Sequence, residues 1–179
     1  MSLLTSRTHH DDKTAASVTD VIMVIDAHAL LSQGAEPSRE PDTPTVAEAK
    51  CCYVIVPNAP KQMGRNSGEI LLNVPNGTYL RIRPTTMSMR AEYSAMLTNI
   101  KLANENTLTK PELKVDDDIT IRRPATEDSS LLEEKQVIDC YWGTCVLSHG
   151  AVDAHVDVMV TDREANVLGC FRLNMNFSV

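Results

Sequence analysis

The chain has 179 residues, 42% of them hydrophobic, and a formal net charge of −7 with a pI near 5.2. This length is enough for one domain with a sizeable core. An acidic chain has no electrostatic attraction to nucleic acid or to an anionic membrane surface, and no apolar run approaches the roughly 20 residues that span a bilayer. We therefore expect neither nucleic acid nor a membrane as a partner.

Residues 1–17 are polar and lack the apolar segment of a secretory signal. We expect a flexible tail over 1–17, a single domain over 18–179, and a cytoplasmic location. The five cysteines show no Cys-x-x-Cys spacing, and four of them lie in apolar segments. The sequence thus indicates free, reduced thiols and no cofactor.

The first predicted strands are residues 21–25 and 51–56. Between them, Asp26 is a candidate N-cap for one helical turn. The loop 36–45 contains three prolines, which exclude a regular helix. Its length and polarity make it a candidate functional loop, or else a cover for a sheet edge.

Asn76-Gly77 is the strongest short-range hairpin signal in the chain, because both residues accept positive φ. It follows a short predicted strand over 69–74. The strand after it, over 78–83, alternates, with Arg81 and Arg83 on its polar face. These arginines are either solvated or a site for an anionic ligand.

Residues 93–102 fit a strand or a helix, and we prefer a strand. Residues 103–135 are polar and contain two prolines, so we predict only one short strand there, at 119–121. The acidic cluster 116–118 lacks the spacing of an EF-hand loop, which favours a solvated turn over a calcium site.

Apolar character returns over 136–147, where Gly143 suggests a bulge or bend. Residues 152–160 alternate cleanly, a turn is expected at 162–166, and the last strand also alternates. Seven to nine short strands with one or two helical turns indicate an all-β protein. We predict an antiparallel β-sandwich.

Two groups of residues are candidates for a binding site. Asp153, His155 and Asp157 share one strand face and either form an exposed polar face, which we favour, or bind a metal or sugar. Tyr141 and Trp142, the only tryptophan, either belong to the core or form an aromatic platform for carbohydrate.

The strand ending in Ile25-Asp26, followed by Pro37-Ser38-x-x-Pro41-x-x-Pro44-Thr45, resembles the opening of the PixA/AidA inclusion-body protein family. Weaker likeness continues through 53–57, 76–83 and 158–171, so the resemblance covers about residues 18–179. The chain departs from the family pattern at 173–175, where a Trp-Asp-Pro segment is usual, and at Ile82, where tryptophan is usual.

The resemblance implies a small soluble bacterial protein with a β-sandwich of jelly-roll type and no catalytic motif. Relatives are often under quorum-sensing or stationary-phase control, and some accumulate as inclusions. Our first hypothesis is therefore a non-enzymatic accumulation or stress-associated protein that self-associates. The second is a lectin-like carbohydrate-binding module using Tyr141, Trp142, Asp153, His155 and Asp157. The third is a metal-dependent enzyme using Asp153, His155 and Asp157.

Overall fold

The structure, a computed structural model, describes residues 17–179 except 35, 58–67, 90–91 and 127–129. The predicted N-terminal tail lies outside the described residues, apart from Ser17, which begins the first strand. The described residues form ten strands, one short α-helix and one turn of 3-10 helix. No helix among them is long and apolar enough to cross a membrane.

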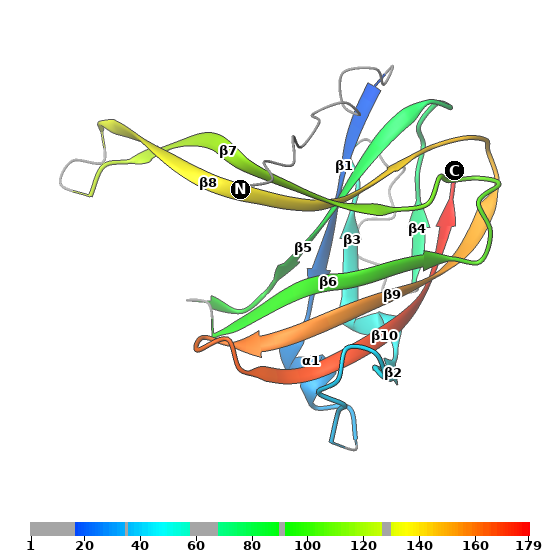
Figure 1. The fold of residues 1–179 in the computed structure, drawn as a ribbon, viewed down its shortest axis with the longest axis horizontal. Helices are drawn as coiled ribbons and strands as arrows, with labels where there is room; N and C mark the ends of the chain where they lie inside the picture. Colours follow the sequence, from blue (N-terminus) through cyan, green and yellow to red (C-terminus); the bar gives the residue numbers. More distant parts are fainter. Residues whose placement is uncertain (1–16, 35, 58–67, 90–91, 127–129) are drawn as a thin grey trace, which may run out of the picture.

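Five strands form one sheet, here called sheet A, in the order β3-β1-β5-β8-β7. Their bounds are Cys52–Ile55 for β3, Ser17–Ile25 for β1, Thr78–Thr86 for β5, Leu132–Cys145 for β8 and Glu112–Pro124 for β7. The strands β7 and β8 form a long hairpin that extends away from the rest of the molecule (Figure 1).

The other five strands form sheet B, in the order β2-β10-β9-β6, with β4 also paired to β10. Their bounds are Thr45–Ala47 for β2, Val167–Ser178 for β10, Ala151–Asp162 for β9, Tyr93–Leu102 for β6 and Glu69–Leu71 for β4. Between β1 and β3 the chain forms the helix α1 (Ala27–Leu31), then β2, then the 3-10 turn η1 (Ala49–Cys51).

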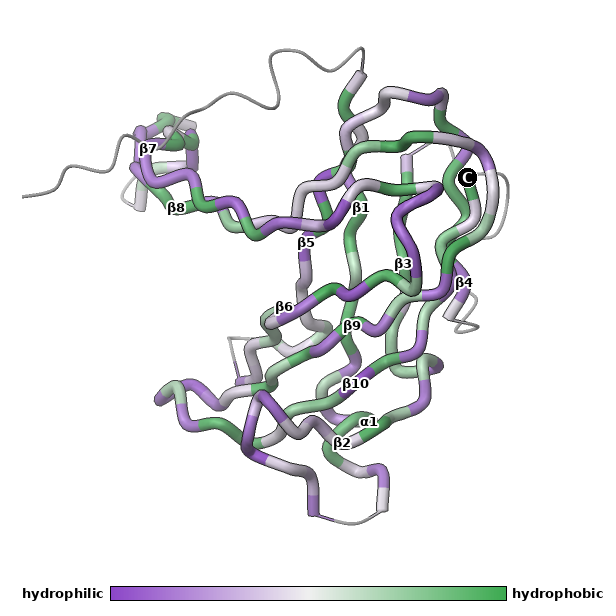
Figure 2. Tube along the Cα trace, turned by 45° about the vertical axis from the view of Figure 1, so that its right-hand side comes forward, coloured by the Kyte–Doolittle hydropathy of each residue, from purple (hydrophilic) through white to green (hydrophobic). Residues whose placement is uncertain are grey.

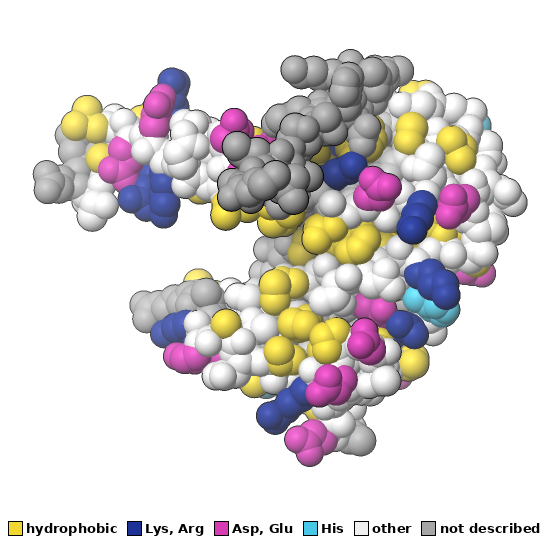
Figure 3. Space-filling view, viewed as in Figure 1, with side chains coloured by type: hydrophobic (Ala, Val, Ile, Leu, Met, Phe, Trp, Pro, Cys, Tyr) yellow, Lys and Arg dark blue, Asp and Glu magenta, His cyan; other side chains and the backbone are white. Residues whose placement is uncertain are grey.

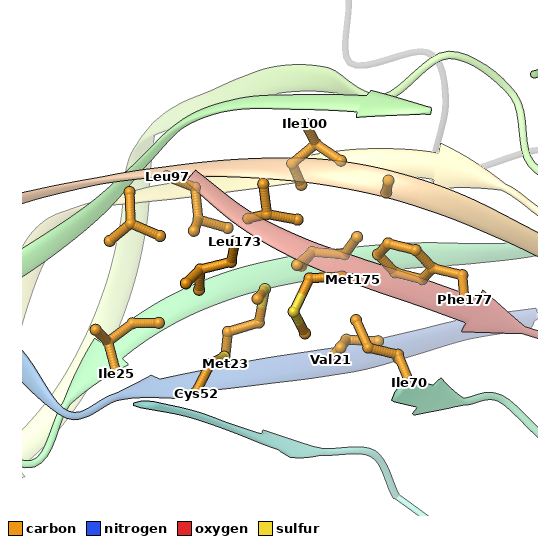
Figure 4. Close-up of a cluster of buried hydrophobic side chains, with 14 of the residues drawn as sticks. Val21, Met23, Ile25, Cys52, Ile70, Leu97, Ile100, Leu173, Met175 and Phe177 are labelled. Atoms are coloured by element: carbon orange, nitrogen blue, oxygen red, sulfur yellow. The ribbon is translucent and has the colours of Figure 1, made fainter. Parts of the chain in front are cut away.

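The core lies between the two sheets, whose inner side chains point toward one another (Figure 4). Alternation along the strands produces this arrangement, since successive side chains point to opposite faces. The buried hydrophobic side chains of β9 are the predicted ones: Val152, Ala154, Val156, Val158 and Val160. Hydrophobic and hydrophilic residues alternate along sheet B in Figure 2. The predicted all-β architecture, with two sheets around one core, is thus present, but the described residues form ten strands in place of the predicted seven to nine.

The prediction that all strands are antiparallel is wrong. β1 and β5 run parallel from Ser17↔Thr78 to Ile25↔Thr86, and both β2 and β4 run parallel to β10. The expected hairpin at Asn76-Gly77 does not form either. Gly77 has the positive φ of 80° that the motif predicts, but the turn leads from β4 in sheet B to β5 in sheet A. Turn chemistry sets a change of direction and leaves open which strand becomes the neighbour.

Two further predictions need correction. The polar region at 103–135 contains the 13-residue strand β7 and the start of the 14-residue strand β8, instead of one short strand. Gly143 is not a bulge, because β8 keeps a regular register with β5 from Trp142 to Cys145. Its missing side chain leaves room for Tyr79: a Cβ there would lie 1.9 Å from the tyrosine hydroxyl oxygen.

Other local predictions are confirmed. The side chain of Asp26 caps α1 by accepting a hydrogen bond from the Ala29 amide at 2.9 Å. Residues 93–102 form β6, and the turn at 162–166 joins β9 to β10. The loop 36–45 covers part of the β10 edge, where the Cys170 amide donates to the Ser38 carbonyl at 2.6 Å.

Candidate functional site

Asp153, His155 and Asp157 lie on the outer face of sheet B, each opposite a polar residue of β10. The Asn176 amide donates to Asp153 at 2.7 Å, and His155 Nδ1 lies 2.8 Å from the Asn174 side-chain oxygen. Asp153 and His155 are exposed. These two pairs present carboxylate, imidazole and amide groups side by side to solvent.

Asp157 has a different environment, with only 3% of its surface exposed. Its carboxylate accepts two hydrogen bonds from the Arg172 guanidinium, at 2.7 and 2.8 Å, and one from Asn99 at 3.3 Å. The hydrogen bond to Asp157 raises the pKa of Arg172. A buried carboxylate needs such partners, and these occupy both oxygens. Asp157 therefore supports the face and is not available to a ligand.

A groove of about 420 Å³ opens over the exposed part of this face. Its lining residues are Gly68, Glu69, Asp153, Ala154, His155, Asn174, Met175 and Asn176. A second hollow of about 800 Å³ shares Asn174 with it and includes Gln33, Glu48 and Lys50. These donors and acceptors suit a hydroxyl-rich ligand, but none of the described lining residues is Phe, Tyr or Trp.

The described residues contain no group of three or more His, Cys, Asp or Glu side chains arranged to hold a metal ion. On the outer face of sheet B, Asp157 binds Arg172, Asp153 binds Asn176 and His155 contacts Asn174. The three predicted ligands are therefore each engaged by a different β10 residue.

Trp142 lies apart from this face, on β8 of sheet A. Its ring is partly buried against the core, and its indole Nε1 donates to the Leu97 carbonyl of β6 at 3.0 Å. The hydrogen bond connects sheet A to sheet B. The core alternative for this residue is thus the one that the structure favours, and Trp142 is not an exposed platform beside the polar face.

Tyr141 points to the opposite side of β8 and lies beneath Arg83, whose guanidinium carbon is 4.9 Å from the ring centroid. Arg83 also pairs with Asp139 and Asp20, and Asp20 accepts two further hydrogen bonds from Arg81, both at 2.9 Å. The Arg83 hydrogen bond lowers the pKa of Asp139. The predicted anion-binding arginines are thus paired with carboxylates across β1, β5 and β8.

The hairpin of β7 and β8 is the feature that sequence reasoning missed. We call residues 112–124 and 132–141 the arm. It projects from the body at the left of Figure 1, and Figure 3 shows hydrophobic, basic and acidic side chains mixed along it. Its exposed large hydrophobic residues are Leu113, Val115, Ile121, Leu132 and Ile138.

On one face of the arm, a row of apolar side chains extends from the core into solvent. Leu113 pairs across the strands with Trp142, and Val115 pairs with Cys140, so these side chains share a face with Ile138, the next residue but one along β8. Ile138 is 66% exposed. A row of apolar side chains therefore runs from the half-buried tryptophan into solvent.

The comparisons with known proteins identify the class. A family model described as PixA, inclusion body protein, matches residues 17–179. The chain belongs to this family, which confirms the resemblance seen in the sequence. The crystal structure of an inclusion body protein of the PixA family from Burkholderia cenocepacia J2315 is similar, with a TM-score of 0.74 and 15% identity over 93% of this chain and 98% of that chain. At that identity the likeness shows the fold alone. No curated protein matches the chain.

Proposed function

We propose that this protein is a non-enzymatic member of the inclusion body family that accumulates in the cytoplasm by self-association, and that the arm makes the contact between copies. The observation that carries the proposal is the row of exposed apolar side chains on the arm, from Leu113 and Val115 to Ile138. The association with quorum sensing or stress is part of the same proposal and rests on the family resemblance.

A two-stranded hairpin is marginally stable in water, and three or more strands with a covered face are normally needed. The distal arm has only its two strands, and in addition exposes apolar side chains that monomeric proteins usually cover. Contact with another copy would remove this surface from water and stabilise the ribbon.

Sedimentation velocity tests the proposal. The wild-type chain should form species heavier than the 19.7 kDa monomer as its concentration rises. The double variant Val115→Thr, Ile138→Thr keeps residues with high strand propensity and removes apolar surface, so it should remain closer to the monomer. Val46→Thr is the matched control, because Val46 is 67% exposed on β2, in the other sheet.

The proposal fails if the wild-type chain sediments as a monomer at every concentration tested. It also fails if Val46→Thr weakens association as much as the arm variant does, since exposed apolar surface in general would then be responsible. Circular dichroism of each variant checks that the fold is retained.

The groove on sheet B favours a second candidate function, a carbohydrate-binding module. Its support is the set of exposed polar groups from Asp153, His155, Asn174 and Asn176 around one hollow. The test is a thermal-shift panel of mono- and oligosaccharides, with calcium and with a chelator. A ligand at a hundredfold excess over its Kd stabilises the native state by about 2.7 kcal/mol. A shift that Asn174→Ala abolishes and Trp142→Phe retains would support the groove.

A further inference from the structure

The outer edge of β7 has no strand beside it among the described residues, because sheet A ends there. At 13 residues β7 is a long edge strand. Its backbone donors and acceptors on that side can pair with another strand. An edge of this length is therefore the most direct place for a second chain to bind.

The sequence of β7 is self-complementary when read in both directions from Thr120. Ile119 and Ile121 flank Thr120, Asp117 and Asp118 precede them, and Arg122 and Arg123 follow. When two such strands pair antiparallel about Thr120, Ile119 lies opposite the partner's Ile121 and Asp118 lies opposite the partner's Arg122. A two-fold axis repeats both pairs.

We propose that two copies of this chain pair edge to edge through antiparallel β7 strands centred on Thr120; this inference rests on the self-association proposed above and adds a backbone contact at the edge of the arm to the side-chain contact on its apolar face. The two copies of sheet A become one continuous sheet, with the strand order β8-β7-β7-β8 at its centre. The occupant of the free edge is thus a second copy of the chain.

The charges around Asp118 and Arg122 support this register. Within one chain, Arg122 pairs with Glu134 of β8 at 3.1 Å, and both side chains are largely exposed. Asp117 and Asp118 have no ion-pair partner among the described residues, although the Asp118 amide contacts Asp116. In the dimer, Arg122 would lie between Glu134 of its own chain and a carboxylate from the partner. Opposite charges on neighbouring strands stabilise a sheet, and like charges destabilise it.

The bulge and the charged residues of β7 disfavour other pairings. The ladder between β7 and β8 is irregular from Asp116 to Ile119, and bulges and charges on an edge strand prevent indiscriminate pairing. Moving the centre from Thr120 to Ile119 places Asp118 opposite the partner's Thr120. Moving it to Ile121 places Asp118 opposite the partner's Pro124. Only the pairing centred on Thr120 matches both the isoleucines and the charges.

A cysteine at the axis tests the register. In the Cys140→Ser background, which removes an exposed native thiol, Thr120→Cys would face its own copy at an antiparallel Cα separation of about 4.5–5.5 Å, within disulfide range. Gln136→Cys is the matched control. Gln136 is the exposed cross-strand neighbour of Thr120, and in the dimer its two copies are three strand spacings apart, about 14 Å.

Mild oxidation of the full chain should give a covalent dimer for Thr120→Cys and little for Gln136→Cys. Equal cross-linking of both would overturn the proposal, because random collision would explain it. A wild-type dimer in sedimentation with no cross-link at Thr120 overturns the β7 pairing and leaves self-association standing. A wild-type monomer at all concentrations overturns both.

Charge exchange provides the second test. Asp118→Arg should raise the dimer Kd by at least about tenfold, since it places arginine opposite arginine twice. The variant Arg122→Asp, Glu134→Arg should do the same while keeping an ion pair within the arm. Mixing the two variants should restore a heterodimer, because each altered residue then meets an opposite charge. Failure of the mixture to associate more tightly than either variant alone contradicts the pairing.

Discussion

Trp142 of sheet A donates its indole hydrogen to the Leu97 carbonyl of sheet B at 3.0 Å. The bond lies where the arm leaves the body, because Trp142 pairs with Ile82 on one side and with Leu113 on the other. The residue that the sequence offered as a sugar platform thus holds the two sheets together at the base of the arm.

Replacing Trp142 should therefore cost stability. Trp142→Phe keeps most of the packing and loses the hydrogen bond, so we expect a loss of about 1 kcal/mol in the free energy of unfolding. Trp142→Ala also leaves a cavity and should cost about 3 kcal/mol. Urea unfolding followed by circular dichroism measures both. Leu147→Ala, at a 47% exposed site, is the control and should change stability by less than about 0.5 kcal/mol.

The ion pair between Asp157 and Arg172 is asymmetric, since the side chains are 5% and 34% exposed, respectively. Arg172→Met leaves a buried carboxylate without its main partner and should cost about 3 kcal/mol. Asp157→Asn leaves an arginine that reaches water, so the loss should be smaller, about 1–2 kcal/mol. Urea unfolding of the two variants at pH 7 shows which variant loses more free energy of unfolding. A larger loss for Asp157→Asn would contradict the assigned burial.

Part of the polar face of sheet B could be predicted from the sequence. Alternation placed Asp153, His155 and Asp157 on one face, and the predicted turn at 162–166 made β9 and β10 neighbours. The pairing of His155 with Asn174 follows from that register. The burial of Asp157 does not, because it also depends on Asn99 of β6, the neighbour of β9 on its other side.

The sequence also excluded a shared platform for the two aromatic residues. Tyr141 and Trp142 are consecutive in a strand, so they had to point to opposite faces and could not form one platform. The parallel pairing of β1 with β5 was not readable, because local patterns do not specify distant partners. The arm was missed because a ribbon exposed on both faces needs no regular alternation of apolar and polar residues.

Stability below about pH 4 should depend on Asp139, whose pKa is lowered chiefly by its hydrogen bonds from Arg83. Because the folded-state pKa is below the unfolded value, the stabilisation is complete above the unfolded pKa and is lost as the pH falls through the folded one. Asp139→Asn should thus reduce the difference in unfolding free energy between pH 6 and pH 2.5. Asp42→Asn, in the exposed loop 36–45, is the control and should retain the wild-type difference.

Gly143 should not tolerate a side chain. A Cβ at this position would lie 1.9 Å from the hydroxyl oxygen and 2.7 Å from the ring carbon Cζ of Tyr79, so Gly143→Ala should cost about 2 kcal/mol. In a Tyr79→Ala background the same change should cost much less, because the ring is gone. A double-mutant cycle by urea unfolding measures this coupling, and additive losses would show that the tyrosine is not the obstacle.

The cysteines should differ in reactivity although all five are free. Burial raises the pKa of Cys52 to about 12, and it also raises the pKa of Cys51 and Cys170. Since the thiolate is the reactive form, these thiols should react slowly with a disulfide reagent at pH 8. Cys140, exposed on the arm, should react first. Cys140→Ser should remove the fast phase, and 6 M guanidinium chloride should make the remaining thiols react alike. A fast phase that persists in Cys140→Ser would place the accessible thiol elsewhere.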